Sequence, residues 1–184
     1  LAYAKLTDLL AKKIEHPKLL KLKEIAQSEL TSNPKTKIIV FAQYRDTIAK
    51  LQEEVKSGKN AAPVEFIGQT KKKGKGLSQK EQMQILNEFK LGFYNILIAS
   101  QIGEEGLDIT ETDTVIFYEP VPSAVRRVQR MGRTARTKAG KILILMTKDT
   151  RDEAYHWSGY KKEKNMKKIL YSMQKQRSVV DFRA

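Results

Sequence analysis

The sequence predicts an α/β fold in which a mainly parallel sheet of five to six strands is covered by helices on both faces. Short apolar runs rich in β-branched residues alternate along the chain with amphipathic segments at helical spacing. The runs show no alternation of polar and apolar residues, which is typical of parallel strands buried on both faces. Regular alternation of strand and helix favours a parallel sheet over a sandwich or a helical bundle.

The chain opens with helical segments. Apolar residues recur at helical spacing over 3–31, with a break at His16-Pro17, where proline ends one helix and can begin the next. We therefore expect a helical lead-in, a main domain and a tail, at residues 1–33, 34–176 and 177–184.

Five apolar runs predict the strands, at residues 37–42, 63–68, 94–100, 114–119 and 141–146. Ser78 and Glu81 have the spacing of a capping box, which predicts a helix to about residue 91. Ser123 is placed as an N-cap and Gly132 as the end of a further helix. Other helices are expected over 47–55 and from 151 to about 174.

Composition indicates one well-buried core and an anionic partner. The chain has 184 residues, 40% of them hydrophobic, which suits a single domain. Lys and Arg outnumber Asp and Glu by 35 to 21, for a formal net charge of +14 and a pI near 9.8. Such a charge is typical of a polyanion binder, and the alternative is a basic surface that serves solubility or ion-pair networks.

The absence of cysteine excludes disulfides and thiolate metal sites. Two separate histidines, His16 and His156, do not make a metal site, so we expect an intracellular, cytoplasmic protein with no metal held by its own ligands. No apolar run approaches about 20 residues, so no membrane partner is expected. The chain begins at Leu1, and we expect it to be a piece of a longer protein.

Polar residues gather where the predicted strands end. QYR follows the first strand, GQTKKKGKG the second, SQIGEEGLD the third and EPVPS the fourth. Ligands of open parallel sheets bind at the carboxyl ends of the strands. The sequence therefore predicts the functional site at this edge.

Two of these stretches carry distinctive chemistry. In SQIGEEGLD, Gly103 and Gly106 let the backbone bend close to a ligand, and Asp108 suits a ribose hydroxyl; the alternative is an acidic surface turn. In QRMGRTAR, three arginines surround Gly132, and guanidinium forks match phosphate or carboxylate oxygens two at a time. The alternative partners of these arginines are carboxylates of the chain itself, Glu104, Glu105 and Glu119.

Together these stretches resemble the conserved motifs of a known family. VFAQYR is similar to motif IV, IASQIGEEGLDI to motif V and QRMGRTAR to motif VI of the second RecA-like domain of superfamily 2 helicases. GLSQKEQ, FYEPVPSAVRRVQRMGRTAR and TRDEAYHW resemble in particular the archaeal Hef helicases, which are related to the FANCM and Mph1 DNA-repair translocases. The resemblance covers roughly residues 15–174. Gln129, Ser100 and Ala135 stand where histidine, threonine and glycine are frequent in helicases.

The resemblance implies a role for each motif residue. Arg133 and Arg136 would be arginine fingers for the γ-phosphate of ATP, and Gln129 would sense the same phosphate. Gly106 and Asp108 would bind the nucleotide ribose, with Arg130 in a salt bridge that orders this nucleotide-binding set. Nucleic acid would be held by its phosphates at Gln43, Tyr44, Arg45, Gln69, Ser100, Gln101, Lys71, Lys72 and Lys73. The lysines, with Lys75, fit a solvated loop equally well.

A Walker A loop, G-x-x-x-x-G-K-[ST], is absent, since SGKN, KGKG and AGKI lack its first glycine and its hydroxyl. RDEAYH spells a DEAD-like box but follows the polar TKDT, so we interpret it as a helix start. ATP and Mg²⁺ would then be bound mainly by a missing first RecA-like lobe, and this chain alone is expected to be inactive. Residues 1–33 would be the end of an insertion between the lobes.

The expected function is therefore the second lobe of an ATP-dependent helicase on forked or branched DNA. Alternatives are an RNA-directed helicase lobe like those of RIG-I and Dicer, and a non-catalytic nucleic-acid-binding module with the RecA-like shape.

Overall fold

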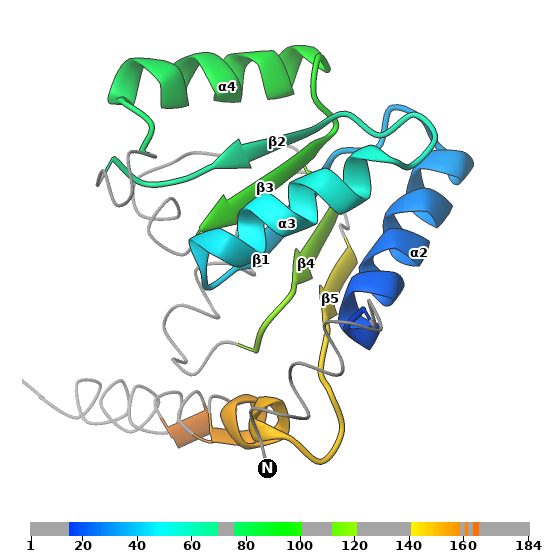
Figure 1. Ribbon diagram of the computed structural model, residues 1–184, viewed down its shortest axis with the longest axis vertical. Coiled ribbons are helices and arrows are strands. Elements are labelled where there is room, and N and C mark those ends of the chain that lie inside the picture. The colour runs from blue at the N-terminus through cyan, green and yellow to red at the C-terminus, as the bar shows by residue number, and fades with distance from the viewer. Residues whose placement is uncertain are drawn as a thin grey trace, which may run out of the picture.

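The computed structural model describes residues 15–69, 76–100, 112–120 and 141–158, with 161, 164 and 165. Five strands form one sheet in the order β2-β3-β1-β4-β5 (Figure 1), and every neighbouring pair is parallel. The prediction of a parallel sheet is confirmed. The strands are β1 Ile38–Ala42, β2 Pro63–Phe66, β3 Ile96–Ser100, β4 Thr114–Phe117 and β5 Lys141–Ile144.

The predicted strands are all present but shorter than the apolar runs that predicted them. Ile67 and Leu145 follow β2 and β5, lie outside the strands, and are still 5% and 8% exposed. The apolar run therefore marks the length of chain that the core buries, which extends past the last residue of the strand, and the N–H of Leu145 still donates to the carbonyl of Phe117 in β4 at 2.9 Å.

Local sequence signals set the helix ends. Helix α2, Pro17–Ser32, begins at a proline, and the His16 ring accepts a hydrogen bond from the backbone N–H of Lys18 at 3.2 Å. Helix α3, Arg45–Lys56, begins two residues before the expected Thr47. Residues 151–158 are helical, which confirms RDEAYH as a helix start. The helix predicted between Ser123 and Gly132 lies outside the described residues.

Helix α4, Gln79–Leu91, has the predicted capping box. The Ser78 hydroxyl accepts from the N–H of Glu81 at 3.3 Å, and the Glu81 carboxylate accepts from the N–H of Ser78 at 2.7 Å. The helix ends at Gly92, whose φ of 87° is a left-handed conformation that glycine adopts without strain.

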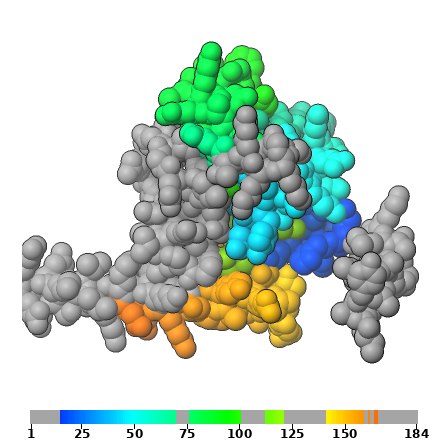
Figure 2. Space-filling view, turned by 60° about the vertical axis from the view of Figure 1, so that its left-hand side comes forward, coloured from blue at the N-terminus to red at the C-terminus, as the bar shows by residue number. Residues whose placement is uncertain are grey.

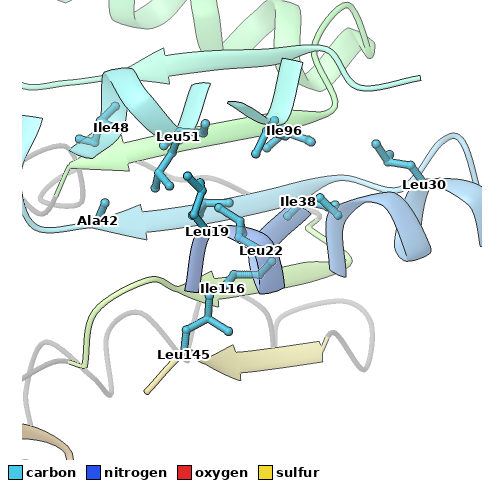
Figure 3. Close-up of a cluster of buried hydrophobic side chains, with 14 of the residues drawn as sticks. Leu19, Leu22, Leu30, Ile38, Ala42, Ile48, Leu51, Ile96, Ile116 and Leu145 are labelled. Atoms are coloured by element: carbon cyan, nitrogen blue, oxygen red, sulfur yellow. The ribbon is translucent and has the colours of Figure 1, made fainter. Parts of the chain in front are cut away.

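Two apolar clusters lie on opposite faces of the sheet, because alternate residues of β1 belong to different clusters. On one face, Ile38, Val40 and Ala42 pack with side chains of α2 and α3. Figure 3 shows this cluster, with Leu19 and Leu22 of α2 beside β1 and Ile116 of β4. On the other face, Ile39 and Phe41 pack with Leu86 and Phe89 of α4.

Helix α2 is part of this same core, since Leu19, Leu22, Ala26 and Leu30 are all buried in it. In the space-filling view α4 (green) rises at one end of the described body and residues 141–158 (yellow to orange) form the other end (Figure 2). The parallel order brings the carboxyl ends of the strands to one edge, where the candidate site lies.

Candidate functional site

The carboxyl edge of the sheet brings together the candidate residues that the structure describes. Ala42 at the end of β1 pairs with Ser100 at the end of β3, and Phe41 pairs with Phe117 of β4. The residues that follow β1 and β4 are therefore neighbours at one edge.

Gln43, Tyr44 and Arg45 leave β1 at this edge and begin α3. The backbone N–H of Gln43 donates to the Glu119 carboxylate at 2.8 Å, which joins the ends of β1 and β4. The Arg45 guanidinium donates to the carbonyl of Gly68 at 3.1 Å, which joins the start of α3 to the chain after β2. Tyr44 lies between these two anchored residues, and its side chain is 61% exposed. The ring of Tyr44 is thus exposed to solvent on a segment of backbone that is anchored on both sides.

Gln69 and Ser100 lie at the same edge in contrasting environments. Gln69 is exposed beside the anchored Gly68. Ser100 is 4% exposed, and within the described part of the chain its hydroxyl has no hydrogen-bond partner. A buried hydroxyl without a partner carries a desolvation penalty.

The remaining candidates lie outside the described residues. They are Gln101, Lys71, Lys72 and Lys73 of the nucleic-acid set, and Gly106, Asp108, Gln129, Arg130, Arg133 and Arg136 of the nucleotide set. Their assigned roles stay predictions.

The sequence did not predict a role for Lys18, which lies in the first turn of α2 and contacts the end of β4 at this edge. Its side chain is 8% exposed, and its ammonium donates to the carbonyl of Tyr118 at 3.1 Å and forms an ion pair with Asp152. The same nitrogen lies 5.7 Å from the centroid of the Tyr118 ring, within the range of a cation–π contact. One side chain thus links α2, the end of β4 and the helix that begins after β5.

The titration of its neighbours reflects this environment. Burial raises the pKa of the Tyr118 phenol to about 12, helped by the charges of Glu119, Glu15 and Asp152, so the phenol stays protonated. Burial acts to raise the pKa of Asp152 too, but hydrogen bonds from Lys18 and Thr147 and the charge of Lys18 outweigh it and lower that pKa. The N–H of Thr147 donates to the Asp152 carboxylate at 2.9 Å. Asp152 is therefore a carboxylate at neutral pH.

A cavity of about 320 Å³ between α2 and α3 is lined by Lys23, Gln27, Glu54 and Gly58 among others. Lys23 and Glu54 form an ion pair of 3.0 Å in it, and the hydrogen bond from Lys23 lowers the pKa of Glu54. The cavity reaches the loop before β2, at the amino edge of the sheet, so it is separate from the candidate site.

The described residues do not offer a metal site or a membrane span. Within these ranges, no three His, Asp or Glu side chains gather as a metal ion would need. No described helix is both long enough and apolar enough to cross a bilayer.

Comparison with known proteins assigns the family. The model of the helicase conserved C-terminal domain matches residues 18–138. The helicase domain of Hef from Pyrococcus furiosus superposes with a TM-score of 0.67 at 47% sequence identity, over 83% of this chain and 30% of that one. This similarity confirms the predicted RecA-like fold.

Curated relatives agree with the structural match. MJ1505 of Methanocaldococcus jannaschii, provisionally named an ATP-dependent RNA helicase, is 43% identical over 165 residues, 90% of this chain and 21% of that protein. The ATP-dependent DNA helicase mph1 of Aspergillus niger is 36% identical over 156 residues, 77% of this chain and 14% of that protein. The chain therefore spans about a fifth or less of these two relatives. It belongs to the helicase conserved C-terminal domain family, as a RecA-like lobe similar to those of Hef and Mph1.

Proposed function

We propose that this chain is the second RecA-like lobe of an ATP-dependent, intracellular helicase or translocase that acts on forked or branched DNA. The observation that carries the proposal is that hydrogen bonds hold Gln43 to Glu119 and Arg45 to Gly68 at one edge of the sheet. The chain with this edge is 47% identical to a Hef helicase domain. A rigid edge with exposed polar and aromatic side chains suits a polyanion that is held by its backbone.

In this proposal Gln43, Tyr44, Arg45 and Gln69 bind one DNA strand by its phosphates, and Gln101 and the lysines Lys71, Lys72 and Lys73 extend the contact. Ser100, which is 4% exposed, supports the end of β3 at this edge. Phosphate contacts carry no base information, so binding is independent of sequence and weakens as salt rises. The net charge of +14 supports the same expectation.

At the nucleotide, Arg133 and Arg136 donate to the γ-phosphate and stabilise the charge that develops during transfer, while Gln129 contacts the same phosphate. Asp108 accepts from the ribose, Gly106 permits close approach, and Arg130 orders the set through a salt bridge. Mg²⁺, when bound, would neutralise charge on the phosphates, and we assign it mainly to the first RecA-like lobe. Closing and reopening of the two lobes would move this lobe along the strand.

DNA-stimulated ATP hydrolysis tests the proposal in the complete protein that carries this chain and its first lobe. Arg136→Ala is expected to lower kcat by about 10³-fold or more, as loss of an arginine finger does, with ATP binding retained. Arg151→Ala, at an exposed arginine outside motifs IV, V and VI, serves as the control and should match the wild type. Hydrolysis unchanged by Arg136→Ala would assign these arginines to nucleic acid or to internal ion pairs.

A second candidate, an RNA-directed helicase lobe, is favoured by the name of the Methanocaldococcus relative, which refers to RNA. ATP hydrolysis stimulated by forks of identical sequence, one of DNA and one of RNA, separates the two. Stronger stimulation by the RNA fork would replace DNA in the proposal and leave the role of the arginines intact.

A further inference from the structure

The backbone at Tyr118 and Glu119 is anchored from two sides where the chain leaves β4. From the side of β1, the N–H of Tyr118 donates to the Phe41 carbonyl at 2.9 Å, and the Glu119 carboxylate accepts from the N–H of Gln43 at 2.8 Å. From the side of α2, Lys18 donates to the Tyr118 carbonyl at 3.1 Å. These three contacts fix the direction in which the chain leaves the sheet.

Lys18 is itself held in place. Its ion pair with Asp152 lies largely out of solvent, with the two side chains 8% and 20% exposed. The Thr147 N–H donates to the same carboxylate, so Asp152 is fixed by the turn that follows β5. In Figure 1 the amino-terminal end of α2 (dark blue) faces the segment that contains residues 145–158 (yellow to orange). The ammonium is thus a bridge between three elements.

A charge at such a buried position calls for a reason other than stability. Two desolvated charges recover little net free energy, and a well-packed apolar pair often stabilises as much or more. An apolar side chain at position 18, however, has no donor for the Tyr118 carbonyl. Unlike the apolar side chains of Leu19 and Leu22 beside it, the ammonium of Lys18 donates a hydrogen bond, and this bond sets the direction of the Tyr118 carbonyl.

The chain that leaves β4 after Glu119 continues to the motif with Gln129, Arg133 and Arg136. We propose that Lys18 is a positioning residue for ATP hydrolysis, which fixes the Tyr118 carbonyl and thereby the point from which the arginine-bearing segment departs. This inference rests on the proposed function. It concerns the chemical step more than nucleotide affinity, because arginine fingers act chiefly on the transition state.

The test compares Lys18 variants in the complete protein with its first lobe. Lys18→Met removes the donor and keeps the volume. Lys18→Arg keeps a charged donor, and Lys18→Met/Asp152→Leu removes both charges so that no buried carboxylate is left unpaired. Lys21→Met is the matched control, because Lys21 lies three residues along the same helix in a pair with Glu24 whose side chains are 56% and 68% exposed. All rates are measured where thermal unfolding curves show each variant to be folded.

Lys18→Met and the double variant are expected to lower kcat for ATP about tenfold, with KM for ATP within about twofold of wild type, since small displacements of catalytic groups act on rate. Lys18→Arg should recover part of the loss, and Lys21→Met should behave as wild type. A folded double variant with the wild-type kcat, or an equal loss in Lys18→Arg, overturns the inference.

Arg136→Ala, assayed in parallel, separates this result from the proposed function. If Arg136→Ala is inactive and Lys18→Met is not impaired, only the inference about Lys18 fails. If Arg136→Ala hydrolyses ATP at the wild-type rate, the proposed function fails and the inference falls with it.

Discussion

Lys18 and Lys21 lie about one turn apart on α2 and meet their carboxylates in different surroundings. The pair of Lys21 with Glu24, at 2.7 Å, is exposed to solvent on both sides, and such pairs contribute about 0.5 kcal/mol or less. The pair of Lys18 with Asp152 is largely buried, so removal of one partner leaves the other desolvated and uncompensated. Burial therefore distinguishes the Lys18–Asp152 pair, whose loss should be costly, from the Lys21–Glu24 pair, whose loss should not.

Stability should depend on pH through Asp152. Its pKa is lowered in the folded chain from an ordinary value of 3.8, so the carboxylate contributes stability above that value and loses it as pH falls through the lower, folded pKa. Asp152→Asn should therefore destabilise the chain by roughly 2 kcal/mol near neutral pH, less than for a fully buried pair. Thermal melts of the wild type and of Asp152→Asn, from neutral pH to below 3.8, measure the difference in their stability. This difference should shrink as the pH falls.

Glu24→Gln provides the comparison for Asp152→Asn, because it removes a carboxylate from the exposed pair with Lys21. A difference in stability between the wild type and Asp152→Asn that stays constant over the whole pH range would contradict the assignment of this stability to the ion pair.

Among the elements, α4 has the clearest sequence signals at both ends. Ser78 and Glu81 satisfy each other's backbone N–H groups at the start, and Gly92 closes the helix in a left-handed conformation. Between these ends, only Leu86 and Phe89 of this helix are buried in the core. A helix with so narrow a buried face depends strongly on its caps.

Ser78→Ala should destabilise the chain by about 1 kcal/mol, because it removes the acceptor for the Glu81 N–H. Urea unfolding followed by circular dichroism measures the difference. Ser78→Asp keeps an acceptor at the N-cap and should lie close to wild type. Equal losses in both variants would show that the hydroxyl oxygen is not the stabilising feature.

The whole molecule is organised by a core to which α2 contributes as fully as the strands do. Leu19, Leu22 and Leu30 are 2% exposed or less and pack on the face of the sheet that α3 also covers. Lys18 and Glu29 add polar links from α2 to β4 and β5, since Glu29 accepts from Thr114 at 3.2 Å and from Lys141 at 2.8 Å. We propose that the folding unit includes α2, whatever the origin of the lead-in.

Removal of residues 1–33 should therefore prevent folding. Three buried leucines stabilise by about 5 to 9 kcal/mol together, which is comparable with the whole stability of a typical domain. A chain that starts at Glu15 keeps every described contact and serves as the control. Circular dichroism and thermal melts compare the two, and a cooperative transition in the chain that starts at Pro34 would contradict the prediction.

The sequence predicted the elements well and their long-range contacts poorly. Five strands and the helices α2, α3 and α4 follow from apolar periodicity, Pro17 and the capping box, which are local signals. Lys18 and Tyr118 are 100 residues apart, and Gln43 and Glu119 are 76 apart, so no local pattern relates them. The edge could be predicted because parallel strands share a direction, but the side chains that anchor it depend on a strand order that periodicity does not encode.

The central place of β1 in the sheet has a consequence for synthesis of the chain. All five residues of β1, IIVFA, are buried, and both strands that pair with it, β3 and β4, come later in the sequence. While the ribosome is still making residues 43–95, this apolar segment has no partner strand and is open to chaperones or to other nascent chains. Translation speed and chaperone supply before β3 emerges should thus influence how much native protein a cell obtains.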